Sequence, residues 1–249
     1  IQLPNYISPV AVAFNLPGIE SLNMDPDTIA QIFDQQITTW TDPAIVEQNP
    51  DADLPDTAIT PVNRSDESGT TENFVEYLAA AAPDSWPYET SGDWPVAGGE
   101  AAQGNSGVVQ AINSGEGAIG YADASQIGDL GTVAVLVGEE YVPFSTEAAA
   151  AVVNASGPAE GADPATGNLA IDLERDTSES GVYPIVLVSY HLACYTYDDA
   201  QTATNVKGFL EYVISEEGQE AAAGAAGSAP ITDESRTAAQ AAIDLIQVG

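Results

Sequence analysis

The sequence predicts an α/β protein with a mostly parallel sheet, and three observations lead to this fold class. Short apolar runs bounded by turn residues alternate along the chain with segments whose apolar residues recur at helical spacing, an order typical of strand–helix–strand units. Apolar residues make up 44% of the 249 residues, which is enough for a buried core and excludes disorder by composition. A chain of this length forms one large domain or two smaller lobes.

The N-terminal part of the chain predicts a strand followed by a helix. The apolar run at 8–15 is stopped by a polar residue and a Pro-Gly pair, so we expect a buried strand there. Apolar residues at helical spacing predict a helix over 27–36, with Asp25 or Asp27 as its N-terminal cap. Residues 41–57 are polar and rich in proline, which predicts a surface loop.

A second strand and helix follow. The short run at 59–63 predicts a strand, and Pro61 within it indicates an irregular or edge strand. The polar, glycine-containing segment 64–71 then leads into residues whose apolar side chains again recur at helical spacing. The order is therefore strand, polar turn, helix.

The remaining elements continue the alternation. Residues 83–104 are rich in Trp, Gly and Pro and predict a loop, after which Gly104 opens a helix capped by Asn105 or Ser106. Residues 155–168 predict another loop. The other expected elements are strands at 117–121, 133–137 and 183–190 and helices at 206–215 and 237–246.

The charge of the chain excludes several classes of partner. It has 38 acidic and 4 basic side chains, which gives a formal net charge of −34. Proteins that bind nucleic acid or dock on an anionic membrane surface need clustered Lys and Arg, so we expect neither partner. Such a charge keeps a protein soluble and suits a salty or extracellular medium, where repulsion between carboxylates is screened.

Cysteine and histidine are too few for several kinds of site. The single cysteine, Cys194, excludes an internal disulfide, and the single histidine, His191, excludes the paired-histidine zinc motifs. We therefore expect no metal and no cofactor. His191 is expected to be a strand-end residue rather than a general base, and Cys194 a small buried apolar side chain rather than a nucleophile. The sequence contains no apolar run long enough to span a membrane.

The segment 64–71 combines three kinds of group that bind anions. Arg64 offers a guanidinium that can form paired hydrogen bonds with an oxyanion. Ser68, Thr70 and Thr71 offer hydroxyl donors. Their backbone amides lie at a predicted helix N-terminus, where unpaired N–H groups and the helix dipole favour negative charge.

Two further residues support an anion site in this segment. Gly69 lets a ligand approach the backbone, and Asp66 is close enough in sequence to hold the Arg64 side chain. An ordinary capped helix start would contain the same small polar residues. An arginine directly before it, in a chain with so few basic residues, favours the anion site. The lysine and the glycine spacing of a P-loop are absent.

The stretch 64–71, Arg-Ser-Asp-Glu-Ser-Gly-Thr-Thr, resembles the phosphate-binding turn of the substrate-binding proteins of the Pst ABC phosphate transporter. Other motifs resemble that family in order and spacing over nearly the whole chain, and together they are specific although each alone is weak. They are the apolar run 10–18, the I-x-x-W-x-D…I…N-P pattern at 37–50, G-N-S-G at 104–107 with G-A-I-G-Y at 117–121, and Tyr-Pro-Ile at 183–185.

The resemblance implies an α/β, two-lobed type II periplasmic-binding-protein fold with mostly parallel sheets and an incomplete first lobe. Residues 1–12 would be a remnant of the first lobe and a crossover strand, 13–185 the second lobe with the anion-binding turn, and 186–249 the return to the first lobe. The family's first strands, which supply further Thr and Ser donors and an Asp that accepts the proton of hydrogen phosphate, have no counterpart before Ile1. A separate or unassigned N-terminal segment is therefore expected to complete the first lobe.

The resemblance also implies a function and a site. The protein would not be an enzyme; it would bind inorganic phosphate between its lobes and deliver it to the permease of an ABC importer. It would be periplasmic or extracellular, with membrane anchoring through the absent segment as an option. Arg64 would pair with phosphate, Asp66 with Arg64, and Ser68, Gly69 and Thr70 would donate hydrogen bonds. Glu67 departs from the small residue common at its position and would point to solvent, because a carboxylate repels an oxyanion.

Three alternatives stay open at this point. Another oxyanion, such as sulfate or molybdate, would use the same donors. Paired carboxylates could act in a glycosidase, but 38 acidic residues make some pair inevitable. A calcium-dependent extracellular surface or assembly protein would use the acidic loop with Asn49, Asp51, Asp53 and Asp56, which lacks the glycine and terminal glutamate of an EF-hand.

Overall fold

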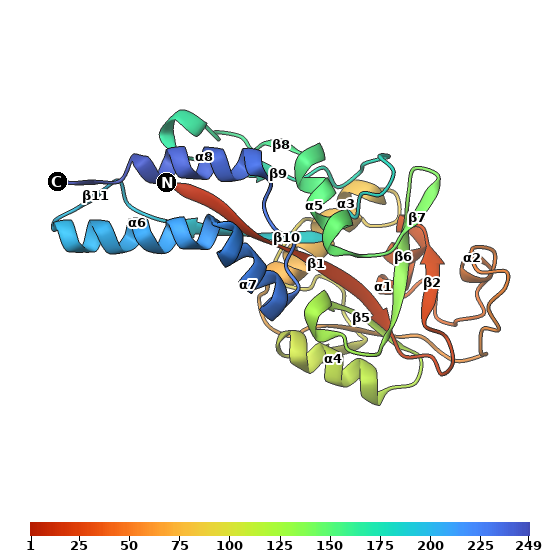
Figure 1. The fold of residues 1–249 in the computed structure, drawn as a ribbon. Helices are drawn as coiled ribbons and strands as arrows, with labels where there is room; N and C mark the ends of the chain where they lie inside the picture. The colour runs from red at the N-terminus through yellow and green to blue at the C-terminus, as the bar shows by residue number, and fades with distance from the viewer.

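The strand β1 (Gln2–Phe14) connects the two lobes of the molecule (Figure 1). The computed structural model describes residues 1–249. The first part of β1 pairs antiparallel with β10 (Val186–Leu192), and its last part pairs antiparallel with β5 (Ala118–Asp123) and β6 (Gly131–Val137). We call residues 10–155 the large lobe, and residues 1–5 with 189–249 the small lobe.

The sheet of the large lobe is mostly parallel, as the sequence predicts. Its strand order is β2-β6-β1-β5-β3-β4, where β2 is Ser21–Met24, β3 is Thr60–Arg64 and β4 is Glu100–Ala102. β2 is parallel to β6, and β3 is parallel to both β5 and β4. β1 runs against its neighbours β5 and β6, and the short edge strand β7 (Glu140–Val142) is antiparallel to β6.

Side-chain alternation along β1 divides the core between the two faces of this sheet. Val12 and Phe14 point into the main core, where α1 (Pro26–Phe33) and α3 (Gly69–Ala81) pack. Ala11 and Ala13 belong to a separate apolar cluster on the opposite face. On that face α4 (Gly104–Ser114) packs closely on β5 and β3, since a Cβ at Gly120 would lie only 2.9 Å from the Ile112 side chain and from the Val62 carbonyl.

The small lobe is built around a few helices at the other end of β1 (Figure 1). α6 (Ala200–Ile214) packs on α7 (Glu216–Ala226) and α8 (Asp233–Asp244), and the short strands β11 (Thr196–Tyr197) and β12 (Gln247–Val248) pair in parallel. Its core is a separate cluster of buried apolar residues: Leu3, Leu210, Ile214, Ile231, Ala239, Ala242, Ile243 and Ile246.

The segment that follows the large lobe packs back on the small one. After α5 (Thr146–Ala155) come the short strands β8 (Gly157–Pro158) and β9 (Ile171–Asp172). Between these strands, the Gln2 N–H donates to the Gly167 carbonyl at 2.8 Å, and the Leu169 N–H donates to the Gln2 carbonyl at 3.0 Å. This segment therefore contacts the small lobe, although it lies within the range 13–185 expected for the second lobe.

Most elements expected from the sequence are present, but several differ. β1 begins at Gln2 rather than near residue 8, because Pro4 and Asn5 interrupt the apolar run without ending the strand; the pairing with β10 shifts register between Pro4 and Tyr6. The expected loops at 41–57 and 83–104 contain α2 (Pro43–Val46) and β4. The helices α5 and α7 were not predicted, because alanine dominates both and gives little apolar periodicity in spite of its high helix propensity.

Two expectations about caps and one about burial are settled by the geometry. Asp25 caps α1, accepting the Thr28 N–H at 2.7 Å. Neither Asn105 nor Ser106 caps α4, because this helix already begins at Gly104. Cys194 is exposed rather than buried, because β10 ends at Leu192 and the chain then runs along the outside of the small lobe.

None of the helices combines the length and the apolar character needed to cross a membrane.

The net charge predicts a stability that depends on salt. Self-repulsion at a charge of −34 destabilises the compact state, and raising the salt from about 0.1 M to about 1 M shortens the screening length from about 10 Å to about 3 Å. We expect the midpoint of thermal unfolding, followed by circular dichroism, to rise by about 5 °C or more over this range of NaCl. A midpoint that stays constant or falls would contradict the prediction.

Candidate anion-binding site

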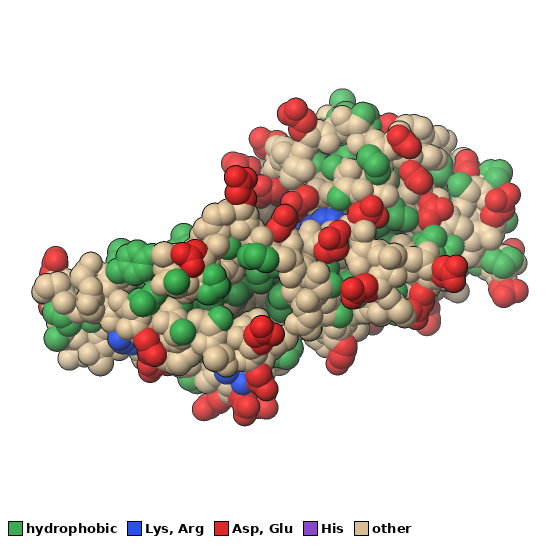
Figure 2. Space-filling view, turned by 90° about the horizontal axis from the view of Figure 1, so that it is seen from above, with side chains coloured by type: hydrophobic (Ala, Val, Ile, Leu, Met, Phe, Trp, Pro, Cys, Tyr) green, Lys and Arg blue, Asp and Glu red, His purple; other side chains and the backbone are tan.

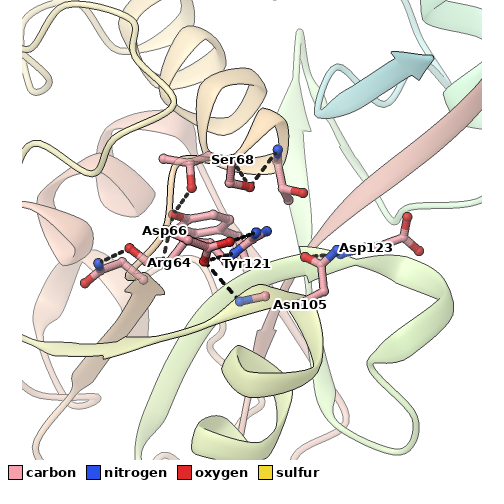
Figure 3. A network of polar contacts seen from close by, with 10 residues as sticks. Arg64, Asp66, Ser68, Asn105, Tyr121 and Asp123 are labelled. Carbon is pink, nitrogen blue, oxygen red and sulfur yellow. Dashed lines mark hydrogen bonds and ion pairs between the residues drawn. The ribbon is translucent and has the colours of Figure 1, made fainter. Parts of the chain in front are cut away.

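The segment 64–71 forms a turn between the end of β3 and the start of α3 (Figure 3). It lies beyond the carboxyl end of a strand that is parallel to both of its neighbours, the usual position of ligand sites in α/β sheets. Ser68 is the N-terminal cap of α3, and its Oγ accepts the N–H groups of Thr70 at 3.1 Å and Thr71 at 3.4 Å.

The pairing expected between Asp66 and Arg64 is present. Arg64 Nε donates to Asp66 Oδ1 at 2.8 Å, and Nη2 donates to Oδ2 at 2.6 Å, which is the paired geometry that fixes a guanidinium in its plane. Asp66 Oδ1 also accepts the Gly104 N–H at 3.0 Å. The hydrogen bond from Arg64 holds the pKa of Asp66 well below its usual range, and the same bond raises the pKa of Arg64. Both groups therefore stay ionised in neutral and mildly acidic solution.

Several donors of the turn remain available. The two bonds to Asp66 use Nε and Nη2 of Arg64 and leave Nη1. The Gly69 N–H makes no backbone hydrogen bond. The Ser68 hydroxyl oxygen accepts from two amides, so its own proton can be donated, and the Thr70 hydroxyl takes no part in these bonds. The structure thus brings the expected residues Arg64, Ser68, Gly69 and Thr70 into one turn.

The backbone of the turn is held by neighbouring segments. The Ser65 N–H donates to the Ala102 carbonyl at 2.9 Å, and the Ser68 N–H donates to the Gly92 carbonyl at 3.0 Å. A Cβ at Gly92 would lie 3.3 Å from the Ser68 nitrogen, so the loop containing Gly92 leans directly on the turn. Sequence reasoning treated 83–104 as a plain loop and missed this support, because no local pattern shows which turn a loop will contact.

Tyr121 of β5 contacts both ends of the turn, and the sequence pattern G-A-I-G-Y gives no signal of this role. Its hydroxyl accepts the backbone N–H of Arg64 at 3.3 Å and lies 2.7 Å from Thr71 Oγ1. The residue is fully buried, and burial raises the pKa of its hydroxyl to about 12. It therefore stays neutral at physiological pH. Figure 3 shows it beneath the turn, between Arg64 and the start of α3.

The surroundings of the turn also match the expectation for Glu67. Its side chain is exposed, away from the buried Ser68. On the other side, a Cβ at Gly69 would lie 3.4 Å from Leu187 of β10, so the strand that leads to the small lobe borders the start of α3.

Two of the other three basic residues, Arg175 and Arg236, are engaged within the protein. Arg175 is buried, donates to the carbonyls of Pro184 and Val186 at 2.9 Å each, and pairs with Glu76 at 2.8 Å. Arg236 donates to the Ile214 carbonyl and pairs with acidic residues on the small lobe. Arg64 is partly buried and paired with Asp66, but it lies at the turn before α3, and its Nη1 makes no hydrogen bond within the protein.

The structure gives less support to the alternatives of a calcium site and a catalytic histidine. The chain contains no group of three or more His, Cys, Asp or Glu residues placed to hold a metal ion. In the acidic loop, the Asn49 amide is consumed by bonds to the backbone of Asn23 and Ile45, so it is a structural residue. His191 is the next-to-last residue of β10, contacts the Asn5 side chain, and has its pKa lowered by burial.

The fold has two lobes, with a turn of free donors beyond the carboxyl end of β3, and comparison with known proteins gives its family. A profile of the PBP superfamily domain matches residues 1–217. The chain is 35% identical over 255 residues to phosphate-binding protein PstS 3 of Mycobacterium tuberculosis, covering 98% of this chain and 66% of that protein. It is 34% identical over 223 residues to PstS 2 of the same species, covering 86% of this chain and 58% of that protein.

Solved structures agree on the fold. A high-affinity periplasmic phosphate-binding protein determined with phosphate bound superposes with a TM-score of 0.75 at 22% identity, over 97% of this chain and 70% of that one. A phosphate-binding protein from Stenotrophomonas maltophilia gives 0.74 at 21% identity, over the same shares. The chain belongs to the PBP superfamily, has the type II binding-protein fold, and is related to the PstS proteins. The resemblance and fold class predicted from the sequence are confirmed.

The cap at Ser68 predicts a measurable loss of stability. Replacing Ser68 by Ala leaves the N–H groups of Thr70 and Thr71 without their acceptor, which costs about 1 kcal/mol. We expect the Ser68→Ala protein to unfold about 2–4 °C lower.

Ser68→Thr, which keeps the hydroxyl, serves as the control and should unfold close to the wild-type temperature. An unchanged midpoint in Ser68→Ala would show that Ser68 does not cap α3 in solution.

Proposed function

We propose that this chain binds inorganic phosphate at the turn 64–71 as part of the substrate-binding component of an ABC phosphate importer. The observation that carries the proposal is the set of convergent free donors at this turn: the Arg64 guanidinium, fixed by Asp66, beside the unpaired start of α3. The names of the relatives support phosphate as the anion, since PstS 3 and PstS 2 are called phosphate-binding proteins.

The arrangement suits an anion because its donors are already aligned before the ligand arrives. An oxyanion that leaves water loses its hydration shell, and fixed N–H and O–H groups replace it without reorganisation. The strongly negative chain opposes the approach of an anion, but that field is screened within about 10 Å at moderate salt, whereas the donors act at contact distance. We therefore expect the global charge to slow association without removing the site.

The proposal includes what the protein does not do and where it acts. We propose that it is a binding protein and not an enzyme, that its macromolecular partner is the permease of the importer, and that it works in the periplasm or outside the cell. The relationship to PstS proteins, which are named as phosphate-binding proteins, supports this reading.

The donors of the turn do not by themselves select phosphate. The free groups at 64–71 are donors, and both carboxylate oxygens of Asp66 already accept bonds. Distinguishing hydrogen phosphate from fully ionised sulfate needs an acceptor for the phosphate proton. We infer that this chain alone binds sulfate or molybdate with an affinity similar to that for phosphate, and that selectivity comes from groups outside the turn.

The surface of the small lobe supports a further segment on that side. β10 pairs with β1 along one edge and with no other strand. Exposed apolar side chains gather on this lobe, in the left part of Figure 2. They are Leu192, Tyr195, Phe209, Tyr212, Leu245 and Val248. The chain spans 66% of the length of PstS 3. We propose that a segment equivalent to part of the remaining length covers this face and completes the first lobe.

The cores of the two lobes bear on the division of the chain expected from its sequence. We propose that 1–12 and 186–249 belong to the first lobe and 13–185 to the second. Leu3 shares a core with residues from α6 to Ile246, while Ile7, Val10, Val12 and Phe14 of β1 belong to the main core, so the crossover between the lobes lies within β1. The segment 157–172 would then bridge the two lobes.

Replacing Arg64 tests the proposal directly. Arg64→Gln removes the charge and one side of the anion contact, and hydrogen bonds to charged groups contribute about 1.5–3 kcal/mol. Calorimetric titration should therefore show phosphate affinity lowered about ten- to one-hundred-fold.

Arg236→Gln removes an arginine from the small lobe and is the matched control, expected to bind phosphate as the wild type does. A wild-type chain that binds no phosphate, or an Arg64→Gln chain that binds it as well as wild type, would rule out the proposed site.

The pKa shifts at the turn predict the pH dependence of anion binding. The folded-state pKa of Asp66 is lowered, so its carboxylate stays ionised and keeps its hydrogen bonds to Arg64. These bonds are lost only as pH falls through the lowered pKa of Asp66. Arg64 has a raised pKa. His191 lies four residues along β10 from Leu187, roughly 13 Å away.

Sulfate, which does not change its charge in this range, should bind with the same affinity within about twofold from about pH 8 to about pH 5, at fixed ionic strength. A sigmoidal change centred between these values would show that a titrating group belongs to the site.

A further inference from the structure

The turn 64–71 has two ends, and an anion bound there contacts both only if they are correctly spaced. Arg64 stands at the end of β3, and the free amide of Gly69 stands at the start of α3. The backbone bonds of Ser65 to Ala102 and of Ser68 to Gly92 tie the turn to its neighbours, but neither bond connects one end to the other. The distance between the Arg64 backbone, which carries the guanidinium fixed by Asp66, and the helix donors therefore depends on other contacts.

The Tyr121 hydroxyl bonds to both ends. It accepts the backbone N–H of Arg64 at 3.3 Å, on the strand side, and lies 2.7 Å from Thr71 Oγ1, on the helix side. An oxygen that accepts from Arg64 still has its own proton to donate to Thr71, so one hydroxyl can serve both contacts. Its raised pKa, due mainly to burial, keeps this proton in place at neutral pH.

The ring of Tyr121 is held rigidly enough to transmit this constraint. It stacks on Phe74 of α3 with ring centres 4.5 Å apart and planes 23° from parallel, and on Trp94 at 5.5 Å and 30°. Phe33 of α1 packs against it at 5.9 Å. β5 itself lies between β1 and β3 in the sheet. A hydroxyl on such a support has little freedom to follow either end of the turn.

We propose that Tyr121 is a positioning residue for the anion: its hydroxyl sets the spacing between Arg64 and the N-terminal donors of α3, and so determines affinity without touching the ligand. This inference rests on the proposed function of the turn. It differs from a plain core role, in which the hydroxyl would only satisfy buried neighbours and its loss would lower stability alone.

The test is the Tyr121→Phe chain, titrated with inorganic phosphate and with sulfate, with thermal unfolding measured in parallel. Removing one hydrogen-bonding hydroxyl while keeping the ring should weaken both anions about five- to tenfold. Tyr141→Phe is the matched control: it removes a half-buried tyrosine hydroxyl, bonded to Gln48 at 3.0 Å, from the edge strand β7. It should leave both affinities unchanged.

A double-mutant cycle with Thr71→Val supplies a readout that a purely structural role would not move. If Tyr121 acts through Thr71, the double variant should lose hardly more affinity than Tyr121→Phe alone. If the fold-losses of affinity in the two single variants simply multiply in the double variant, the proposed linkage is contradicted. Wild-type affinity in Tyr121→Phe, even with a lowered unfolding temperature, would overturn the inference and leave the proposed function intact. A wild-type chain that binds neither anion would remove both.

Discussion

The site depends on the pair between Arg64 and Asp66. In a chain of net charge −34, an unconstrained arginine would have many carboxylates to choose from, and its side chain would be free to turn toward any of them. Here the carboxylate two residues later takes two of the guanidinium nitrogens in one plane and is itself held by the Gly104 amide. The remaining nitrogen is left at the turn from which α3 starts. Asp66 therefore orients the Arg64 guanidinium and at the same time keeps it from pairing with other carboxylates.

The rest of the large lobe serves to keep that turn in place. The turn follows β3, which lies between β5 and β4, and both neighbours contribute: β5 through the Tyr121 hydroxyl and β4 through the carbonyl of Ala102. Small residues on one face, such as Ala11, Ala13 and Gly120, let α4 approach closely, and the start of α4 supplies the amide that holds Asp66. The packing of α4 on one face of the sheet therefore helps to position Asp66 and, through it, the Arg64 guanidinium.

The features that could be predicted from the sequence are those that depend on residues close together in the chain. The strand, turn and helix around 64–71 could be predicted because an arginine, a cap and a glycine are adjacent in sequence, and the Arg64–Asp66 pair needs only two residues of spacing. The contributions of Tyr121, Gly92 and Gly104 could not be predicted, since each reaches the turn through tertiary contacts from a distant part of the chain. Cys194 was placed wrongly because residue type predicts burial only on average, and its position past the end of β10 decided otherwise. Alanine-rich helices such as α7 lack the apolar periodicity that identifies a helix in sequence.

The most direct test of the central claim is to observe both ends of the turn while the anion binds. Titration of the isotope-labelled chain with phosphate, followed by nuclear magnetic resonance, resolves the side-chain Nε–H of Arg64 and the backbone amide of Gly69. The account predicts that the two signals shift together along one binding curve, because one ion contacts both the guanidinium and the start of α3. Shifts confined to other parts of the chain, or two curves with different midpoints, would contradict a single site at this turn.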